Sequence, residues 1–135
     1  MNLIERRDVT EATLRWFAAR PFSWRKASTC VHLVRRHLSA MGHKVPPVPR
    51  IQSERSALAA LKAKGWADLA EMLDTFLPRI SPAEAIVGDV VQLPSEGALG
   101  ALCVVVGNGR IMGYSEEHGV LTVAEPHDFA GAWRA

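Results

Sequence analysis

Cys30 is the residue whose type and position in this sequence could support chemistry. It lies in "RPFSWRKASTCVHLVRRHLSAMG", residues 20–42, where a loop pattern gives way to a helical pattern. A cysteine at a helix start lies at the positive end of the helix dipole, beside free backbone amides, and both favour the thiolate. The same amides could stabilise an oxyanion on a bound acyl group. The alternative is core packing, because free cysteine is among the most buried residue types.

A cysteine nucleophile also needs a base within reach of the thiol. His32 follows Cys30 by two positions and therefore projects from another side of the helix. His37 lies about two turns farther along the helix, too far to touch the thiol. His118 in "SEEHG" and His127 in "EPHDF" remain as candidate bases. Either could act only if the sheet folds it over Cys30.

The sequence does not indicate a metal or another cofactor. The two cysteines, Cys30 and Cys103, are far apart, and no histidine pair has ligand spacing. The glycine-containing stretch "VVVGNGRIMG" lacks a dinucleotide-binding fingerprint and indicates a hairpin instead. Cys103 lies in "ALCVVV", where a small packed residue is the better interpretation. We expect both cysteines to be unpaired thiols.

Composition and charge indicate an ordinary globular protein. The chain has 135 residues, of which 48% are hydrophobic and 22% charged. Sixteen basic and fourteen acidic residues leave a net charge of +2, and no basic run is longer than two, so nucleic acid is not an expected partner. The N-terminus has no apolar core of a signal peptide, and no apolar run is long enough to span a membrane.

The helical half is predicted to run from about residue 8 to 80. Asp8 and Glu11 form a capping-box pattern for a first helix that ends before Pro21. Ser28 or Thr29 can cap a second helix. A Pro-rich connector, "HKVPPVPR", is expected to be extended and exposed. Two more helices are indicated, the first opened by a serine and stopped by a glycine, the second ended by a proline: residues 53–65 and 69–78.

The pattern changes to β-rich near Gly88, and the β half is predicted to cover about 86–135. The segments "DVVQL", "ALCVVVG" and "GVLTVAE" indicate strands, and "GNG" indicates a tight turn. Short connections favour an antiparallel sheet of at least four strands. Because "ALCVVV" lacks polar alternation, we expect Val104 and Val106, or their neighbours, to be buried on both faces. The prediction is one α+β domain, residues 1–135, with helices packed on the sheet.

Three segments resemble a known family. "PFSWRKASTCVHLVRRHL" resembles the cysteine-helix entry of NlpC-type, papain-related cell-wall peptidases, and more closely that of a divergent group of phage and prophage tail-module proteins. "GDVVQLPSEGALGALCVVVGNGRIMGY" is similar to the Gly-Asp opening of the family's sheet. "EPHDFAGAWRA" resembles the terminal strand of the phage group. The resemblance runs from about Pro21 to the end and implies a papain-like, NlpC-like fold.

The family's catalytic pattern is only partly present. In active members the nucleophile follows an aspartate, and a histidine opens the strand after the Gly-Asp segment. Cys30 matches the nucleophile, but Thr29 stands in place of the aspartate and Arg25 in place of a glycine. Residues 99–102, "LGAL", stand where the histidine should lie. No family base carries over, so Cys30 is interpreted as a remnant nucleophile.

The resemblance implies a phage or prophage tail-associated structural protein, at the tail tip or hub, whose peptidase-like fold has lost catalysis. Its partners would be other tail proteins, and it would be made in the bacterial host cytoplasm and reside in the virion tail. The alternative is an active cysteine endopeptidase or amidase that cleaves peptidoglycan peptides during DNA entry. In that case His118 or His127 would be a relocated base.

Overall fold

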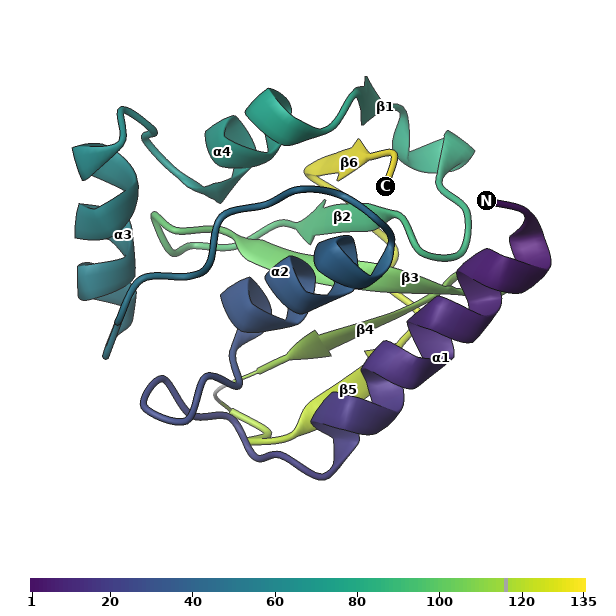
Figure 1. Ribbon diagram of the computed structural model, residues 1–135, viewed down its shortest axis with the longest axis horizontal. Helices are drawn as coiled ribbons and strands as arrows, with labels where there is room; N and C mark the ends of the chain where they lie inside the picture. Colours follow the sequence, from purple (N-terminus) through teal and green to yellow (C-terminus); the bar gives the residue numbers. More distant parts are fainter. Residues whose placement is uncertain (116) are drawn as a thin grey trace.

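The computed structural model describes residues 1–115 and 117–135, and its course runs from helices to strands (Figure 1). The helices are α1 (Leu3–Ala18), α2 (Cys30–Ala40), α3 (Glu54–Ala63) and α4 (Leu69–Phe76), followed by a 3-10 turn, η1 (Pro82–Glu84). The strands are β1 (Arg79–Ile80), β2 (Val90–Leu93), β3 (Ala101–Gly107), β4 (Arg110–Tyr114), β5 (Leu121–Ala124) and β6 (Gly131–Trp133).

The strands form one sheet in the order β1-β6-β2-β3-β4-β5, and every neighbouring pair is antiparallel. The β3–β4 hairpin turns at "GNG", where Asn108 has φ 55° between two glycines that also have positive φ. Glycine and asparagine tolerate this conformation best, so the turn forms where the sequence predicted it. Five of the described strands follow Gly88. The predicted α+β fold with an antiparallel sheet is confirmed.

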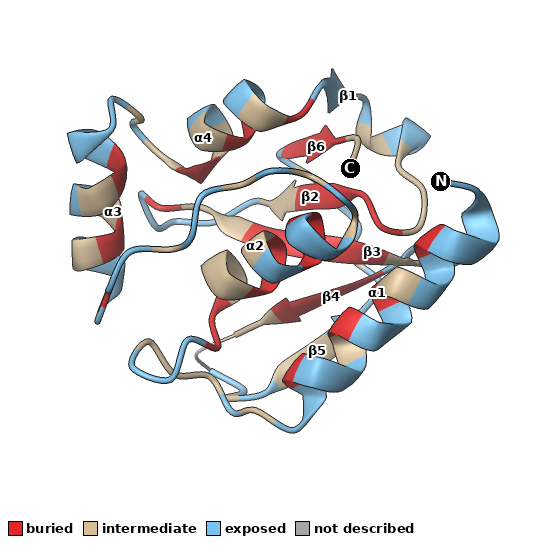
Figure 2. Ribbon diagram, viewed as in Figure 1, coloured by how far each residue is buried: buried red, intermediate tan, exposed pale blue. Residues whose placement is uncertain are grey.

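The helices cover one face of the sheet. Figure 1 shows α2 lying across β3 and β4, α1 packed beside α2 and against β3, and α4 running beside β6. Burial follows this arrangement, because the central strands and the inward faces of the helices are buried (Figure 2). Val104 is fully buried beneath the helices, while Val105, 8% exposed, packs into a smaller cluster on the opposite face. The predicted burial of this strand on both faces is confirmed.

The first helix begins earlier than predicted. Asn2 is its N-cap, and Asn2 and Glu5 form the capping box that the sequence analysis assigned to Asp8 and Glu11. A capping residue followed three positions later by a glutamate occurs twice in this segment. Because the structure uses the earlier pair, α1 is more than one turn longer than predicted. Asp8 and Glu11 instead lie exposed within the helix, where Glu11 pairs with Arg15. The predicted start near residue 8 is therefore wrong.

The β half of the chain also begins earlier than the predicted residue 86, since β1 precedes that position.

The second helix starts where expected, but its cap differs from the pattern. Thr29 is the N-cap of α2, yet its side chain makes no capping hydrogen bond. Its hydroxyl instead lies 2.8 Å from Nδ1 of His32. Ser53 caps α3 as predicted, by accepting a hydrogen bond from the backbone of Ser56. Among the described helices the longest has 16 residues, and none is long and apolar enough to cross a membrane.

A buried carboxylate ties the N-terminal helix to the sheet. Asp89 is fully buried, and its Oδ1 accepts a hydrogen bond of 2.6 Å from Arg6 Nη2. The backbone amides of Ile86 and Ala135 donate to the same carboxylate at 2.9 and 3.0 Å. Arg6 also donates to the carbonyls of Val87 and Ala135. This pair therefore joins α1, the entry to β2 and the segment after β6.

A buried histidine makes a second tie at the same place. His37 of α2 is fully buried, and its Nε2 lies 2.8 Å from the carbonyl oxygen of Gly88. Because a carbonyl only accepts, Nε2 carries the hydrogen. Nδ1 then lies 3.1 Å from the hydroxyl of Thr13 in α1. Burial lowers the pKa of His37 to about 4, so the ring is neutral at neutral pH.

Asp89→Asn should destabilise the fold by about 3 kcal/mol, because it leaves the Arg6 guanidinium buried without an opposing charge. Urea unfolding at pH 7 measures this. The matched control is Asp128→Asn, which neutralises an exposed carboxylate and should change the free energy of unfolding by less than about 0.5 kcal/mol. Equal effects of the two substitutions would contradict the role of the buried pair.

The free energy of unfolding should fall as the pH is lowered from about 6.5 towards 4. The unfolded chain protonates His37 at its ordinary pKa of 6.5, whereas the folded protein resists protonation until about 4. The full loss is about 3 kcal/mol. Urea titrations across this range on the wild type, His37→Gln and the exposed-site control His127→Gln measure it. The slope should be smaller only in His37→Gln; an unchanged slope in that variant would refute the assignment.

Candidate functional site

Cys30 opens onto a cleft of about 480 Å³ at the start of α2, called here the cysteine cleft. Its walls come from the loop before α2, the segment that leads into β3, and the far end of β4. Glu54 at the start of α3 and Tyr114 at the end of β4 also line it. Cys30 itself is half-buried, as the first residue of α2. The sequence therefore predicted the position of this cysteine at a helix start correctly.

The cleft does not favour the thiolate. Burial raises the pKa of the Cys30 thiol above its ordinary value, and the Glu54 carboxylate acts in the same direction. Backbone hydrogen bonding at Leu102 and Val31 lowers this pKa but does not reverse the shift. Reactive cysteines lie in electropositive, partly exposed surroundings, and this one faces burial and a negative charge. The expectation that the helix start favours the thiolate is wrong here, because desolvation outweighs the dipole.

The strand beside Cys30 provides no proton-transfer group. Leu102 of β3 has its backbone against the Cys30 thiol, and its side chain is 1% exposed in the main core. It pairs with Gln92 of β2. Leu99, which precedes the strand, is also buried. The segment in which the resembling family holds its base thus presents aliphatic side chains and backbone to the cysteine.

The structure brings one candidate base to the cysteine cleft and leaves the other outside it. His118 is exposed and lines the same cleft as Cys30. His127 is exposed in the loop after β5 and is absent from the lining. Among the described residues neither imidazole makes a hydrogen bond. Of the nearby acids, Glu117 and Asp128 are exposed, as expected for surface charges, and Glu116 lies outside the described residues.

Cys103 is a packed thiol, as the sequence indicated. It is 6% exposed, and burial raises its pKa to about 12. Its Sγ occupies the space beside Gly113 of β4, where an added Cβ would lie 2.6 Å from the sulfur. Cys30 and Cys103 are both free thiols in this structure.

The structural roles of two residues were not found from the sequence. His37 was considered only as a base for Cys30, whereas it joins α2 to Gly88. The hydroxyl of Tyr114 lies 3.0 and 2.8 Å from the carbonyls of Phe17 and Arg20, and so holds the loop after α1 against the sheet. The sequence marks Tyr114 only by the fact that the chain has no other tyrosine.

The described residues contain no group of three or more histidine, cysteine, aspartate or glutamate side chains arranged to hold a metal ion.

Comparison with known proteins gives one family match. A family model described as a domain of unknown function, DUF6950, matches residues 2–135. The match covers both the helices and the sheet, and so includes the cysteine cleft. No curated protein matches the chain.

The Cys30 thiol should react with iodoacetamide at pH 7 more slowly than glutathione, and Cys103 more slowly still, because their raised pKa values leave little thiolate. Intact-mass measurement over time, followed by peptide mapping, separates the two sites. Glu54→Gln should speed the reaction of Cys30, whereas the control Glu125→Gln should not. A Cys30 that reacts faster than glutathione would contradict the assigned environment.

Proposed function

We propose that this chain, which belongs to the DUF6950 family, is a structural protein of a phage or prophage tail with an NlpC-like, papain-like fold that has lost hydrolase activity. Its work is to contact neighbouring proteins at the tail tip or hub. It is made in the host cytoplasm and carried in the virion tail.

The arrangement of α2 on the sheet supports an NlpC-like architecture. Such a fold needs a cysteine at the first turn of a helix that packs on an antiparallel sheet. Here Cys30 is the first residue of α2, and α2 contacts β3 and β4. The terminal strand ends on Trp133, in the segment that resembles the phage group, and that tryptophan is fully buried.

The environment of Cys30 carries the proposal that catalysis is lost. Amide hydrolysis requires a group that takes the thiol proton and later gives it to the leaving amine. The thiol instead lies against the backbone of Leu102 and near the Glu54 carboxylate, with a raised pKa. Removing the base from a site of this type costs several orders of magnitude in rate. What remains is a cysteine in the position of a nucleophile without the groups that activate one.

The second candidate is an active cysteine endopeptidase or amidase acting on peptidoglycan peptides. One observation favours it: His118 lines the same cleft as Cys30. Catalytic hydrogen bonds are often long in the free enzyme and tighten when substrate binds, so the missing hydrogen bond to Cys30 does not by itself exclude His118 as the base. His127 has no such support, since it lies outside the cleft lining.

Purified peptidoglycan and its stem peptides should remain uncleaved by the wild-type protein, because the raised pKa keeps the Cys30 thiol protonated and no hydrogen bond among the described residues joins it to an imidazole. Product release, measured by mass spectrometry, should match the buffer control for the wild type, Cys30→Ala, His118→Ala and His127→Ala. Cleavage by the wild type that is lost in Cys30→Ala and His118→Ala would establish the second candidate instead.

Tail membership is tested separately from catalysis. Mass spectrometry of purified phage particles, or of particles induced from the prophage, should detect this chain among the tail proteins. The matched control is a particle preparation from a strain in which the gene is deleted. Particles of normal composition that never contain the chain would refute the structural role.

A further inference from the structure

Six cationic side chains gather around a second cleft, of about 420 Å³, called here the basic cleft. It lies between the end of α1, the loop that precedes α2, α2 itself and the Pro-rich connector. The basic residues that line it are Arg20, Arg25, Lys26, Arg35, Arg36 and Arg50. They are more than a third of the sixteen basic residues of the chain, and no aspartate or glutamate of the described residues lines the cleft.

These charges are not neutralised within the described protein. The ion pairs of the described residues use other arginines, and none includes a cation of the basic cleft. Like charges in a shared concave surface repel one another and raise the local concentration of anions. In addition, Nε of Arg35 is buried without a hydrogen-bond partner among the described residues. The cleft therefore has donors and positive charge that the chain itself does not satisfy.

Trp16 holds two of the guanidinium groups in place. The guanidinium carbons of Arg20 and Arg36 lie 3.7 and 3.5 Å from the centroid of its ring. Stacking on an aromatic ring fixes the plane of a guanidinium. Nη1 of Arg20 donates to the carbonyl of Trp16, and the remaining N–H groups of the two guanidinium groups can donate to a carboxylate. Trp24 also lines the cleft, and its ring makes a T-shaped contact with Phe22.

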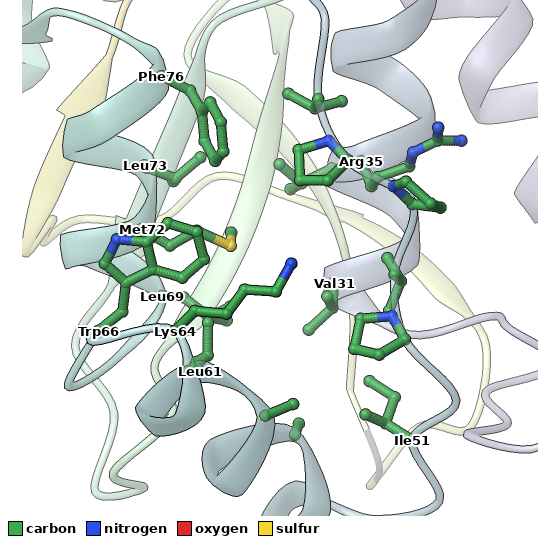
Figure 3. A pocket seen from close by; sticks show the side chains of 18 of the residues that line it. Val31, Arg35, Ile51, Leu61, Lys64, Trp66, Leu69, Met72, Leu73 and Phe76 are labelled. Atoms are coloured by element: carbon green, nitrogen blue, oxygen red, sulfur yellow. The ribbon is translucent and has the colours of Figure 1, made fainter.

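An apolar cavity of about 80 Å³ adjoins the basic cleft (Figure 3). Its walls come from α2, the connector, α3 and α4, and Figure 3 shows Leu61, Met72 and Phe76 facing it and Lys64 reaching across its opening. The cavity and the basic cleft share part of their lining: Arg35, Pro47, Val48, Pro49 and Ile51. A ligand that crosses the connector can therefore occupy both.

We propose that the basic cleft and the apolar cavity together bind an acidic peptide segment of a partner protein, with its carboxylates in the cleft and one aliphatic side chain in the cavity. The size of the cavity supports a single side chain. An apolar cavity of about 150 Å³ accommodates benzene, so the smaller volume here suits the end of a leucine or valine.

The same features disfavour a single-stranded nucleic acid. Such ligands gain affinity by stacking bases on free aromatic faces. Two guanidinium groups already stack on the ring of Trp16. Nucleic acid also has no aliphatic side chain to fill the cavity. The inference does not depend on tail membership or on the chemistry of Cys30, since neither Cys30 nor the sheet edge lines the basic cleft.

The test uses fluorescence anisotropy with the full chain and four labelled probes. The first is a peptide of alternating glutamate and glycine with one central leucine. The others replace its leucine by alanine, replace its glutamates by lysine, or consist of oligothymidylate. The leucine peptide should bind most tightly, and its affinity should fall with added salt. No binding of this peptide, or binding of oligothymidylate at equal or higher affinity, would overturn the proposal.

Charge-matched variants separate the cleft from the net charge. The cleft variant combines three exposed substitutions: Arg25→Gln, Lys26→Gln and Arg50→Gln. The control combines three exposed substitutions outside both linings: Arg7→Gln, Arg55→Gln and Lys62→Gln. The cleft variant should bind the leucine peptide about tenfold more weakly than the control. Equal losses in the two variants would overturn the proposal.

The cavity is tested by filling it. Ala60→Leu places a larger side chain in the lining, whereas Ala59→Leu adds the same atoms at an exposed position of the same helix. The preference for the leucine peptide over the alanine peptide should disappear in Ala60→Leu and persist in Ala59→Leu, with circular dichroism confirming that both fold. A preference that persists in Ala60→Leu would refute the cavity as the anchor site.

Discussion

The buried Asp89 carboxylate is the interaction on which the arrangement of the other parts depends. A carboxylate without water must be surrounded by donors, and here Arg6 and two backbone amides supply them. These donors come from opposite ends of the chain. The requirement to satisfy one charge therefore holds α1, the turn into β2 and the last residues together, and α2 joins them through His37 and Gly88.

This arrangement explains how a cysteine can hold a nucleophile's position without a nucleophile's properties. Anchored through His37, α2 lies against β3, and its first residue lies at the sheet. At this contact Cys30 meets the strand at Leu102. Leu102 meets the packing requirement, whereas a proton-transfer group would also have to meet a chemical one. The packing of α2 on the sheet can therefore be kept while the groups needed for catalysis are lost.

Local patterns predicted most elements, and contacts between distant segments account for what they missed. The hairpin at Asn108 and the helix opened by Ser53 depend on neighbouring residues and were found. The pKa of the Cys30 thiol is raised chiefly by burial, which depends on segments far away in the chain, and the expectation for its thiolate was wrong. The basic cleft could not be predicted from the sequence, because its six cationic residues come from four separate segments and no run of basic residues is longer than two.

The close approach of Cys103 to Gly113 links two positions on adjacent strands. An added Cβ at 113 would lie 2.6 Å from the sulfur, and Cys103 belongs to the smaller buried cluster of the sheet. Volume added at one position must therefore be removed at the other. Gly113→Ala and Cys103→Ala are each unfavourable for opposite reasons, overpacking and a void, and their effects should compensate when combined. Because the two side chains compete for the same space between β3 and β4, the effects of their substitutions on the free energy of unfolding should not be additive.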